Sequence, residues 1–149
     1  MTQQNPTYRI AIGADHAALD LKAILKAHLE AQGHTVEDFG THTTASVDYP
    51  DFAHPVCSGV EAGTFDYGIL LCGSGIGMSM AANKHQGIRA ALIHNTELAA
   101  LTREHNDANV LCMGARFTAP YHATMILDTF LTTAFAGGNH ARRIGKLGC

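Results

Sequence analysis

The segment Leu71–Gly77, with the sequence LCGSGIG, combines a thiol, a hydroxyl and three glycines. Cys72 ends an apolar run, and the glycines let backbone N–H groups approach a ligand closely. Such groups stabilise a negative charge that forms beside them, as in an oxyanion hole. A helix N-terminus also favours the thiolate that a proton-abstracting base requires. The segment therefore favours carbon-acid chemistry at Cys72. The alternative is a tight turn beside a small buried thiol.

The spacing of residues in this chain does not match three other loop motifs that bind phosphate groups. A dinucleotide-binding loop requires G-x-G-x-x-G after the first strand, where the chain has GADH at 13–16. A P-loop ends in Gly-Lys-Ser/Thr, which Met78-Ser79 does not supply. A cysteine phosphatase places an arginine six residues beyond its thiol, where this chain has Met78. The loop is therefore expected to bind neither a nucleotide nor a cofactor.

Two further polar pairs stand at element ends. Asp15 and His16 together can open a sugar ring or hold its hydroxyls; the alternative is a helix cap beside a solvated imidazole. His105 and Asn106, with Asp107 next to them, end a predicted helix. Their alternative role is C-capping, with His105 favoured by the helix dipole and Asn106 in a left-handed conformation. Both pairs stay open between a functional and a structural interpretation.

Arginines supply candidates for anion binding. Arg116 follows the last predicted strand, while Arg142 and Arg143 lie in a basic C-terminal segment after two glycines. The planar guanidinium fork can bind two phosphate oxygens at once. Surface arginines are usually only solvated, so the C-terminal pair alone is weak support for a phosphate site.

The elements that must position these residues alternate between strand and helix. Apolar runs rich in strand formers predict strands at Tyr8–Ile12, Thr35–Phe39, Tyr67–Cys72, Arg89–Ile93 and Asn109–Met113. Helical spacing predicts helices from Ala18 to Gly33, Asp51 to Ala62, the glycine loop to Asn83, Asn95 to His105 and Ala119 to Phe135. This alternation predicts an α/β fold, a doubly wound five-stranded parallel sheet with helices on both faces. Such sheets bind ligands outside the carboxyl ends of their strands.

Bulk composition limits the class of protein. The chain has 149 residues, a net charge of -3 and 46% hydrophobic residues, which fits one domain at 8–149 after a flexible segment at 1–7. The balance of charges predicts no nucleic-acid partner, and no stretch approaches the length of a membrane span. The start lacks a signal-peptide pattern, so we expect a cytoplasmic protein with four free thiols.

Six motifs together resemble the type B ribose-5-phosphate isomerases and the related galactose-6-phosphate isomerase subunits. They are GADHAALDLK, DYPDFA, CGSGIGMSMAANK, GIRAAL, REHNDANVLCMGAR and GGNHARR, and they follow in order from about Arg9 to Arg143. The resemblance implies a Rossmann-like three-layer fold and a homodimer, sometimes a tetramer, with active sites shared between subunits. It also implies a metal-free interconversion of D-ribose 5-phosphate and D-ribulose 5-phosphate in the pentose phosphate pathway.

The same resemblance implies a role for individual residues. It makes Cys72 the base that moves a proton between C2 and C1 through an enediolate; another branch of the family uses a glutamate at the position of Met78. Ser74 matches a hydroxyl that assists proton movement between the oxygens, and His105 matches the acid that opens the ring. Matching substrate contacts are Asp15, His16, Gly73, Ser74, Gly75, Ile76, Gly77, Asn106 and Arg116, with Tyr49 near the site.

One motif departs from the family pattern. The C-terminal motif usually reads G-G-R-H-x-x-R, with both arginines reaching for phosphate, but here Asn139 replaces the first and Arg143 keeps the second. On a helix, Arg142 would face nearly the same way as Asn139 and could compensate. The change leaves open a hexose 6-phosphate, such as allose or galactose 6-phosphate, as the substrate. A non-catalytic phosphosugar-binding subunit is a further alternative, against which Cys72, Ser74 and His105 together argue.

Overall fold

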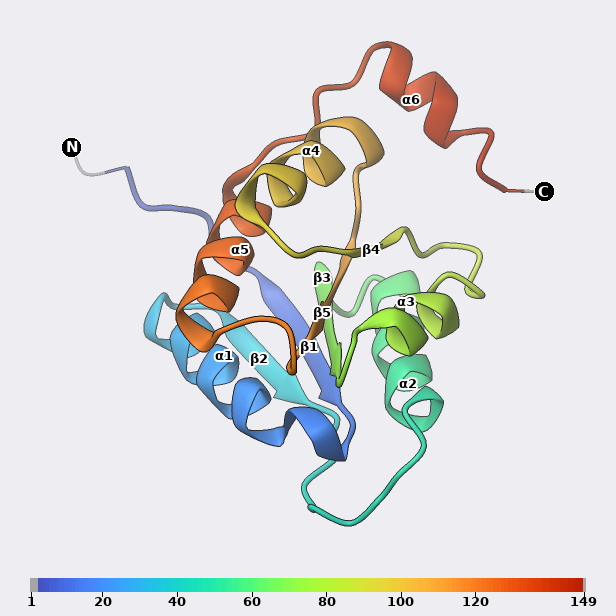
Figure 1. The fold of residues 1–149 in the computed structure, drawn as a ribbon. Helices are drawn as coiled ribbons and strands as arrows, with labels where there is room; N and C mark the ends of the chain where they lie inside the picture. Colours follow the sequence, from blue (N-terminus) through green and yellow to red (C-terminus); the bar gives the residue numbers. More distant parts are fainter. Residues whose placement is uncertain (1–2, 149) are drawn as a thin grey trace.

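A five-stranded, all-parallel sheet lies at the centre of the computed structural model, which describes residues 3–148 (Figure 1). The strands lie in the order β2-β1-β3-β5-β4. They are β1 Arg9–Ala14, β2 Thr35–Asp38, β3 Tyr67–Cys72, β4 Ala90–Leu92 and β5 Val110–Gly114. The predicted α/β fold is therefore confirmed, and β3 has the predicted bounds.

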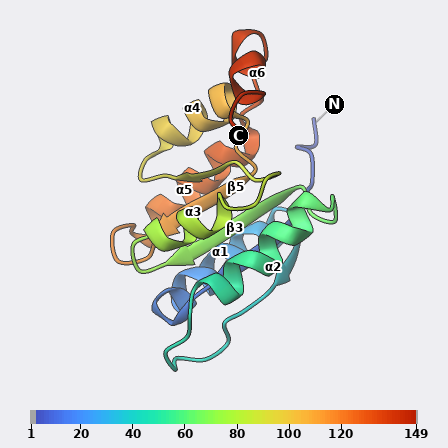
Figure 2. The same ribbon diagram turned by 90° about the vertical axis from the view of Figure 1, so that its right-hand side faces the viewer.

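Helices cover both faces of the sheet. They are the short 3-10 helix η1 His16–Ala18 and the α-helices α1 Leu19–Ala31, α2 Pro50–Glu61, α3 Ile76–Ala82, α4 Thr96–Asn106, α5 Pro120–Thr132 and α6 Asn139–Ile144. Figure 2 shows α2 and α3 in front of the strands, whereas α1 and α5 lie behind them. Asn95 caps α4 as predicted, because its side chain accepts a hydrogen bond from the Leu98 N–H.

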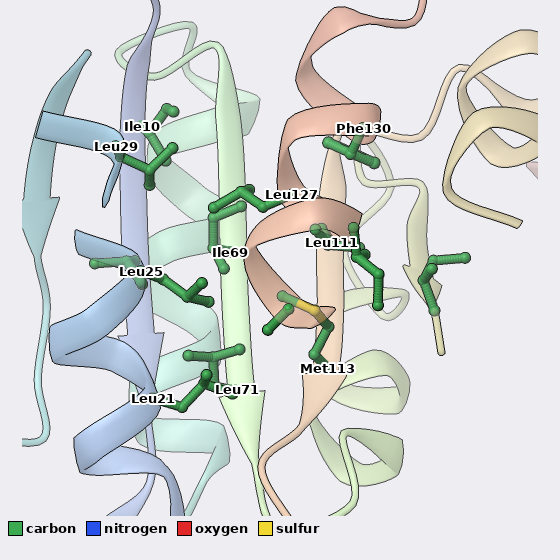
Figure 3. Close-up of a cluster of buried hydrophobic side chains, with 14 of the residues drawn as sticks. Ile10, Leu21, Leu25, Leu29, Ile69, Leu71, Leu111, Met113, Leu127 and Phe130 are labelled. Atoms are coloured by element: carbon green, nitrogen blue, oxygen red, sulfur yellow. The ribbon is translucent and has the colours of Figure 1, made fainter. Parts of the chain in front are cut away.

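Two apolar layers hold the helices on the sheet. On α1, Leu21, Leu25 and Leu29 recur every four residues and so point to one side, where they meet Ile69 and Leu71 of β3 (Figure 3). The intervening β3 residues Leu70 and Cys72 face the opposite layer, beneath α2 and α3. Burial on both faces explains why β3 is apolar almost throughout.

Some predicted details differ from the structure. Helix α5 ends at Thr132, three residues before the predicted Phe135. The left-handed residue after α4 is Asp107, with φ 46°, rather than Asn106, for which this conformation was the structural alternative. Helix α6 was not predicted as a separate element, and none of its six described residues is buried. With no buried face, it has no apolar period for sequence reasoning to detect.

The ends of the chain leave one prediction untested. Residues 3–7 are exposed and lie outside helices and strands, whereas residues 1, 2 and 149 lie outside the described part of the chain. The expected division into a flexible segment 1–7 and a domain 8–149 stays a prediction. Within residues 3–148, no helix combines the length and apolar character that a membrane crossing requires.

Candidate active site

Cys72 is the last residue of β3 and lies at the carboxyl edge of the sheet, the edge where the strands end. Its side chain is buried, and the Gly75 N–H donates a hydrogen bond to its Sγ over 3.1 Å. Gly75 has φ 78°, and a Cβ on it would lie 2.5 Å from the Leu92 Cδ1 atom. Only glycine therefore allows this turn. The result is a thiol held against a backbone donor at the start of α3.

Ser74 lies beside the thiol on the same loop. Its Oγ accepts a hydrogen bond from the Ile76 N–H over 3.2 Å, and the residue is half-buried. The loop also packs backbone to backbone on the end of β5, where a Cβ on Gly114 would lie 2.5 Å from the Ser74 carbonyl oxygen. This packing fixes the loop that carries the hydroxyl two residues after Cys72.

Two further glycines admit polar side chains to the loop. A Cβ on Gly73 would lie 3.4 Å from the Arg116 guanidinium carbon, and one on Gly77 would lie 2.6 Å from the Tyr49 ring. The Arg116 N–H also donates to the Gly73 carbonyl over 3.1 Å. Arg116 and Tyr49 are both exposed, so the loop is bordered by a cation and a phenol that a bound anion can reach.

Asp15 and His16 lie beside the loop, at the end of β1. The Asp15 N–H donates to the Leu71 carbonyl over 3.1 Å, and its buried carboxylate accepts from the Ala17 N–H over 2.9 Å. Asp15 therefore caps η1 through its Oδ1 atom, as the structural interpretation predicted. The His16 Nδ1 atom accepts from the Val47 N–H over 3.2 Å, so neutral His16 carries its proton on Nε2.

His105 and Asn106 lie at the other edge of the sheet, the amino edge, where the strands begin. They end α4, and β5 starts four residues after Asn106. Since β5 spans four residue steps, it separates this corner from the level of Cys72 by about 13 Å. In Figure 1 the carboxyl ends of β1 and β3 lie at the bottom and α6 lies at the top.

The C-terminal helix α6 adds to this second group. The rings of His105 and His140 stack, with centroids 4.2 Å apart and planes 13° from parallel. Asn139 is the first residue of α6, and Arg143 lies one turn further on. Both are exposed, as are His105 and Asn106. The structure therefore gathers the predicted site residues into two groups and does not bring them together within one chain.

Comparison with known proteins identifies the family and confirms the fold. Residues 10–147 match the family described as Ribose/Galactose Isomerase. The chain belongs to this family. It is 43% identical over 136 residues to the ribose-5-phosphate isomerase B of Escherichia coli, which covers 91% of each protein.

Solved structures of family members have the same fold. The ribose 5-phosphate isomerase B of Thermotoga maritima superposes with a TM-score of 0.93 at 49% identity, over 95% of this chain and 97% of that one. The Mycoplasma genitalium enzyme with bound ribulose-5-phosphate superposes with a TM-score of 0.91 at 45% identity, over 93% of each chain. The similarity thus extends over nearly the whole length of this family member.

The other thiols differ from Cys72 in their surroundings. Burial, followed by the charge of Glu61, raises the pKa of Cys57 to about 12, and complete burial raises the pKa of Cys112. Both therefore stay protonated at neutral pH and serve as small apolar groups in the layer between α2 and the sheet. Among residues 3–148, no three His, Cys, Asp or Glu side chains converge as metal ligands. Cys149 lies outside the described residues.

Lys22 and Arg103 help to hold the site but were not singled out from the sequence, whereas Asp107 was noted only as the polar neighbour of His105 and Asn106. Lys22 is buried and donates to the Asp38 carboxylate over 2.7 Å and to the Thr41 carbonyl over 2.6 Å, which ties the loop after β2 to α1. Arg103 and Asp107 form an ion pair at the end of α4, with 2.8 Å between the Nη1 and Oδ1 atoms. The spacing of four residues between opposite charges was the available signal for the second pair.

Proposed function

We propose that this family member is an aldose–ketose isomerase that interconverts D-ribose 5-phosphate and D-ribulose 5-phosphate through an enediolate, as a step of the pentose phosphate pathway. The contact of the Cys72 Sγ atom with the Gly75 N–H, at the carboxyl edge of the sheet, carries the proposal. The contact places the base at the start of α3, beside loop amides that can stabilise the enediolate that the base creates. The names of the Escherichia coli and Thermotoga maritima relatives support the reaction and the pentose substrate.

Ring opening is the first chemical step. The ring oxygen of the furanose gains a proton, for which His105 is the acid, and the C1 hydroxyl loses one, which Asp15 or His16 can accept. The C1–O4 bond then breaks, and the free aldehyde lies next to the C2 hydrogen. An exposed imidazole at the end of a helix suits this role because it can approach a substrate bound to another surface.

Proton transfer between carbons follows. The Cys72 thiolate takes the hydrogen from C2, and the electron pair moves into the C1–C2 bond and onto O1, which gives the enediolate. Ser74 passes the proton of O2 to O1, and the Cys72 thiol returns its proton to C1. The amides of Gly73–Gly77 stabilise the enediolate more than the uncharged sugar, so they raise the rate rather than the affinity.

A second copy of the chain is needed to complete this site. Cys72 lies at the carboxyl edge, while His105, Asn106 and Arg143 lie at the amino edge of the same sheet. A pentose phosphate cannot bridge the strand length of about 13 Å between the base and the acid and still react at C1 and C2. We therefore infer a homodimer, or a tetramer built from such dimers, in which each active site joins the carboxyl edge of one copy to the amino edge of the other.

The phosphate is assigned to arginines of both edges. Arg116 borders the glycine loop, and Arg143 is exposed on α6. Arg142 follows Asn139 by three residues on that helix, which supports the idea that it replaces the missing arginine. Asn139 also keeps open the alternative of a hexose 6-phosphate substrate, such as allose or galactose 6-phosphate. A non-catalytic phosphosugar-binding subunit is disfavoured, since Cys72 and Ser74 retain a geometry suited to chemistry.

The deciding experiment is a ketose assay over pentose 5-phosphates and hexose 6-phosphates. We expect the highest kcat/KM with ribose 5-phosphate. A clear preference for a hexose 6-phosphate would overturn the pentose assignment but keep the reaction. Activity should survive EDTA, because none of the steps uses a metal.

The free thiols of Cys57, Cys72 and Cys112 further support a reducing, cytoplasmic location.

A further inference from the structure

Asp107 has the one left-handed backbone conformation found at a non-glycine position among the described residues, with φ 46°. It is the C-cap of α4 and directly follows His105 and Asn106, the residues proposed to face the substrate. Its N–H donates to the Arg103 carbonyl over 3.2 Å. Left-handed backbone is unfavourable for a residue with a Cβ, so the surroundings of Asp107 must stabilise it.

Two arginines from different elements hold this residue. The Arg103 Nη1 atom donates to the Asp107 Oδ1 atom over 2.8 Å. From the segment before β4, the Arg89 Nε atom donates to the Asp107 carbonyl over 2.9 Å, and its Nη2 atom lies 3.5 Å from the Oδ2 atom. Both the carboxylate and the backbone of Asp107 are therefore fixed. We call these three residues the Asp107 clamp.

The clamp is itself anchored in the core. Arg103 is only 6% exposed, and its guanidinium lies over the rings of Tyr67 and Phe130, with 5.1 and 5.6 Å to the ring centroids. Its Nη1 atom also donates to the Ala108 carbonyl over 2.6 Å. A buried, stacked guanidinium cannot move without loss of these contacts. The rigidity of the sheet thus extends to the end of α4.

We infer that Asp107 is a positioning residue for ring opening, because its clamp fixes the corner that carries His105 and Asn106. His105 and Asn106 are exposed, and an unsupported helix end frays. An acid that must reach a substrate held on another copy gains most from such a fixed corner. The inference rests on the proposed function, since it assumes that His105 protonates the ring oxygen.

The test separates ring opening from proton transfer at carbon. D-ribulose 5-phosphate cannot close a furanose ring, because its O5 carries the phosphate. Exchange of its C1 hydrogen in D2O therefore requires the base but no ring opening. At saturating substrate, Asp107→Ala should lower the turnover of ribose 5-phosphate by about a hundredfold, the typical effect of a 1 Å misplacement, and leave C1 exchange near the wild-type rate. Asp107→Asn, which tolerates left-handed backbone and keeps an acceptor, should restore part of the turnover.

Matched variants make the result decisive. Asp66→Asn removes a carboxylate from the exposed pair with Arg9 and should leave both rates unchanged. Arg89→Gln removes one arm of the clamp without touching the buried Arg103. It should also lower the turnover of ribose 5-phosphate, by a smaller factor, and leave C1 exchange near the wild-type rate. This variant keeps the test available even if Asp107→Ala does not fold. The inference would be overturned if Asp107→Ala keeps the wild-type turnover. It would also be overturned if folded Asp107→Ala and Arg89→Gln lose turnover and exchange equally. Absence of both isomerisation and C1 exchange with the wild-type protein would instead overturn the proposed function.

Discussion

The two edges of the sheet differ in how firmly they hold their functional residues. At the carboxyl edge, Cys72 is buried and its loop packs backbone against backbone on the end of β5. At the amino edge, His105 is exposed and no residue of α6 is buried, and the His105 ring stacks on the ring of His140 in α6. Rigid packing suits a base that must meet one carbon atom. Exposure suits groups that must reach across to another copy of the chain.

This difference indicates which step each edge serves in the proposed dimer. The group that forms and stabilises the enediolate lies within one chain and is preorganised before any partner binds. The group that opens the ring and holds part of the phosphate is brought by the partner. Substitutions at the two edges should therefore impair different steps of the reaction. Variants of opposite edges should restore activity when their subunits are mixed.

Removal of the base should have the largest effect. Cys72→Ala should lower turnover of ribose 5-phosphate by about 10⁴-fold, the upper range for a general base, and should abolish C1 exchange in ribulose 5-phosphate as well. Binding of the sugar phosphate, measured by calorimetry, should persist because the amides and arginines remain. Residual turnover close to wild type would show that another group removes the C2 hydrogen.

Removal of the proposed acid should have a smaller and more selective effect. His105→Ala should lower turnover of ribose 5-phosphate by about a hundredfold, while C1 exchange in ribulose 5-phosphate stays near wild type. His105→Gln serves as the matched variant, since it keeps size and polarity but not the titrating proton. Parallel losses of turnover and exchange would contradict a role confined to ring opening.

Mixing these two variants tests whether the edges meet between copies. If each site takes Cys72 from one copy and His105 from another, exchange of subunits between Cys72→Ala and His105→Ala dimers creates hybrids with one intact site. Half of the dimers become hybrids with one of two sites restored, so activity should recover to roughly a quarter of wild type. No recovery, despite subunit exchange demonstrated by native mass spectrometry, would rule out the shared site.

Sequence patterns predicted the carboxyl edge better than the amino edge for a physical reason. The end of β3 at Cys72 and the turn at Gly75 follow from local rules, an apolar run and a glycine that permits positive φ. These rules did not predict the left-handed backbone of Asp107, because asparagine is the commoner left-handed residue. The contacts of Asp107 with two arginines are tertiary contacts, which local patterns do not reveal.

The separation of His105 from Cys72 follows from topology rather than from any motif. In alternating strands and helices, each helix that leaves the carboxyl edge ends at the amino edge, so the end of α4 cannot reach the end of β3. Family resemblance names both residues for one site without showing this distance. Their common role therefore becomes interpretable only when two copies are considered.

The smallest expected effect concerns the residue that stands in for the missing arginine. Arg142→Ala should raise the KM for ribose 5-phosphate by about tenfold, the loss of one charge-assisted hydrogen bond, with little change in kcat because the phosphate is remote from C1 and C2. Lys146→Ala removes an equally exposed charge just after α6 and should leave KM unchanged. An unchanged KM in Arg142→Ala would mean that Arg116 and Arg143 suffice. Asn139→Arg should then lower KM, because it restores the usual family pattern beside a free phosphate oxygen.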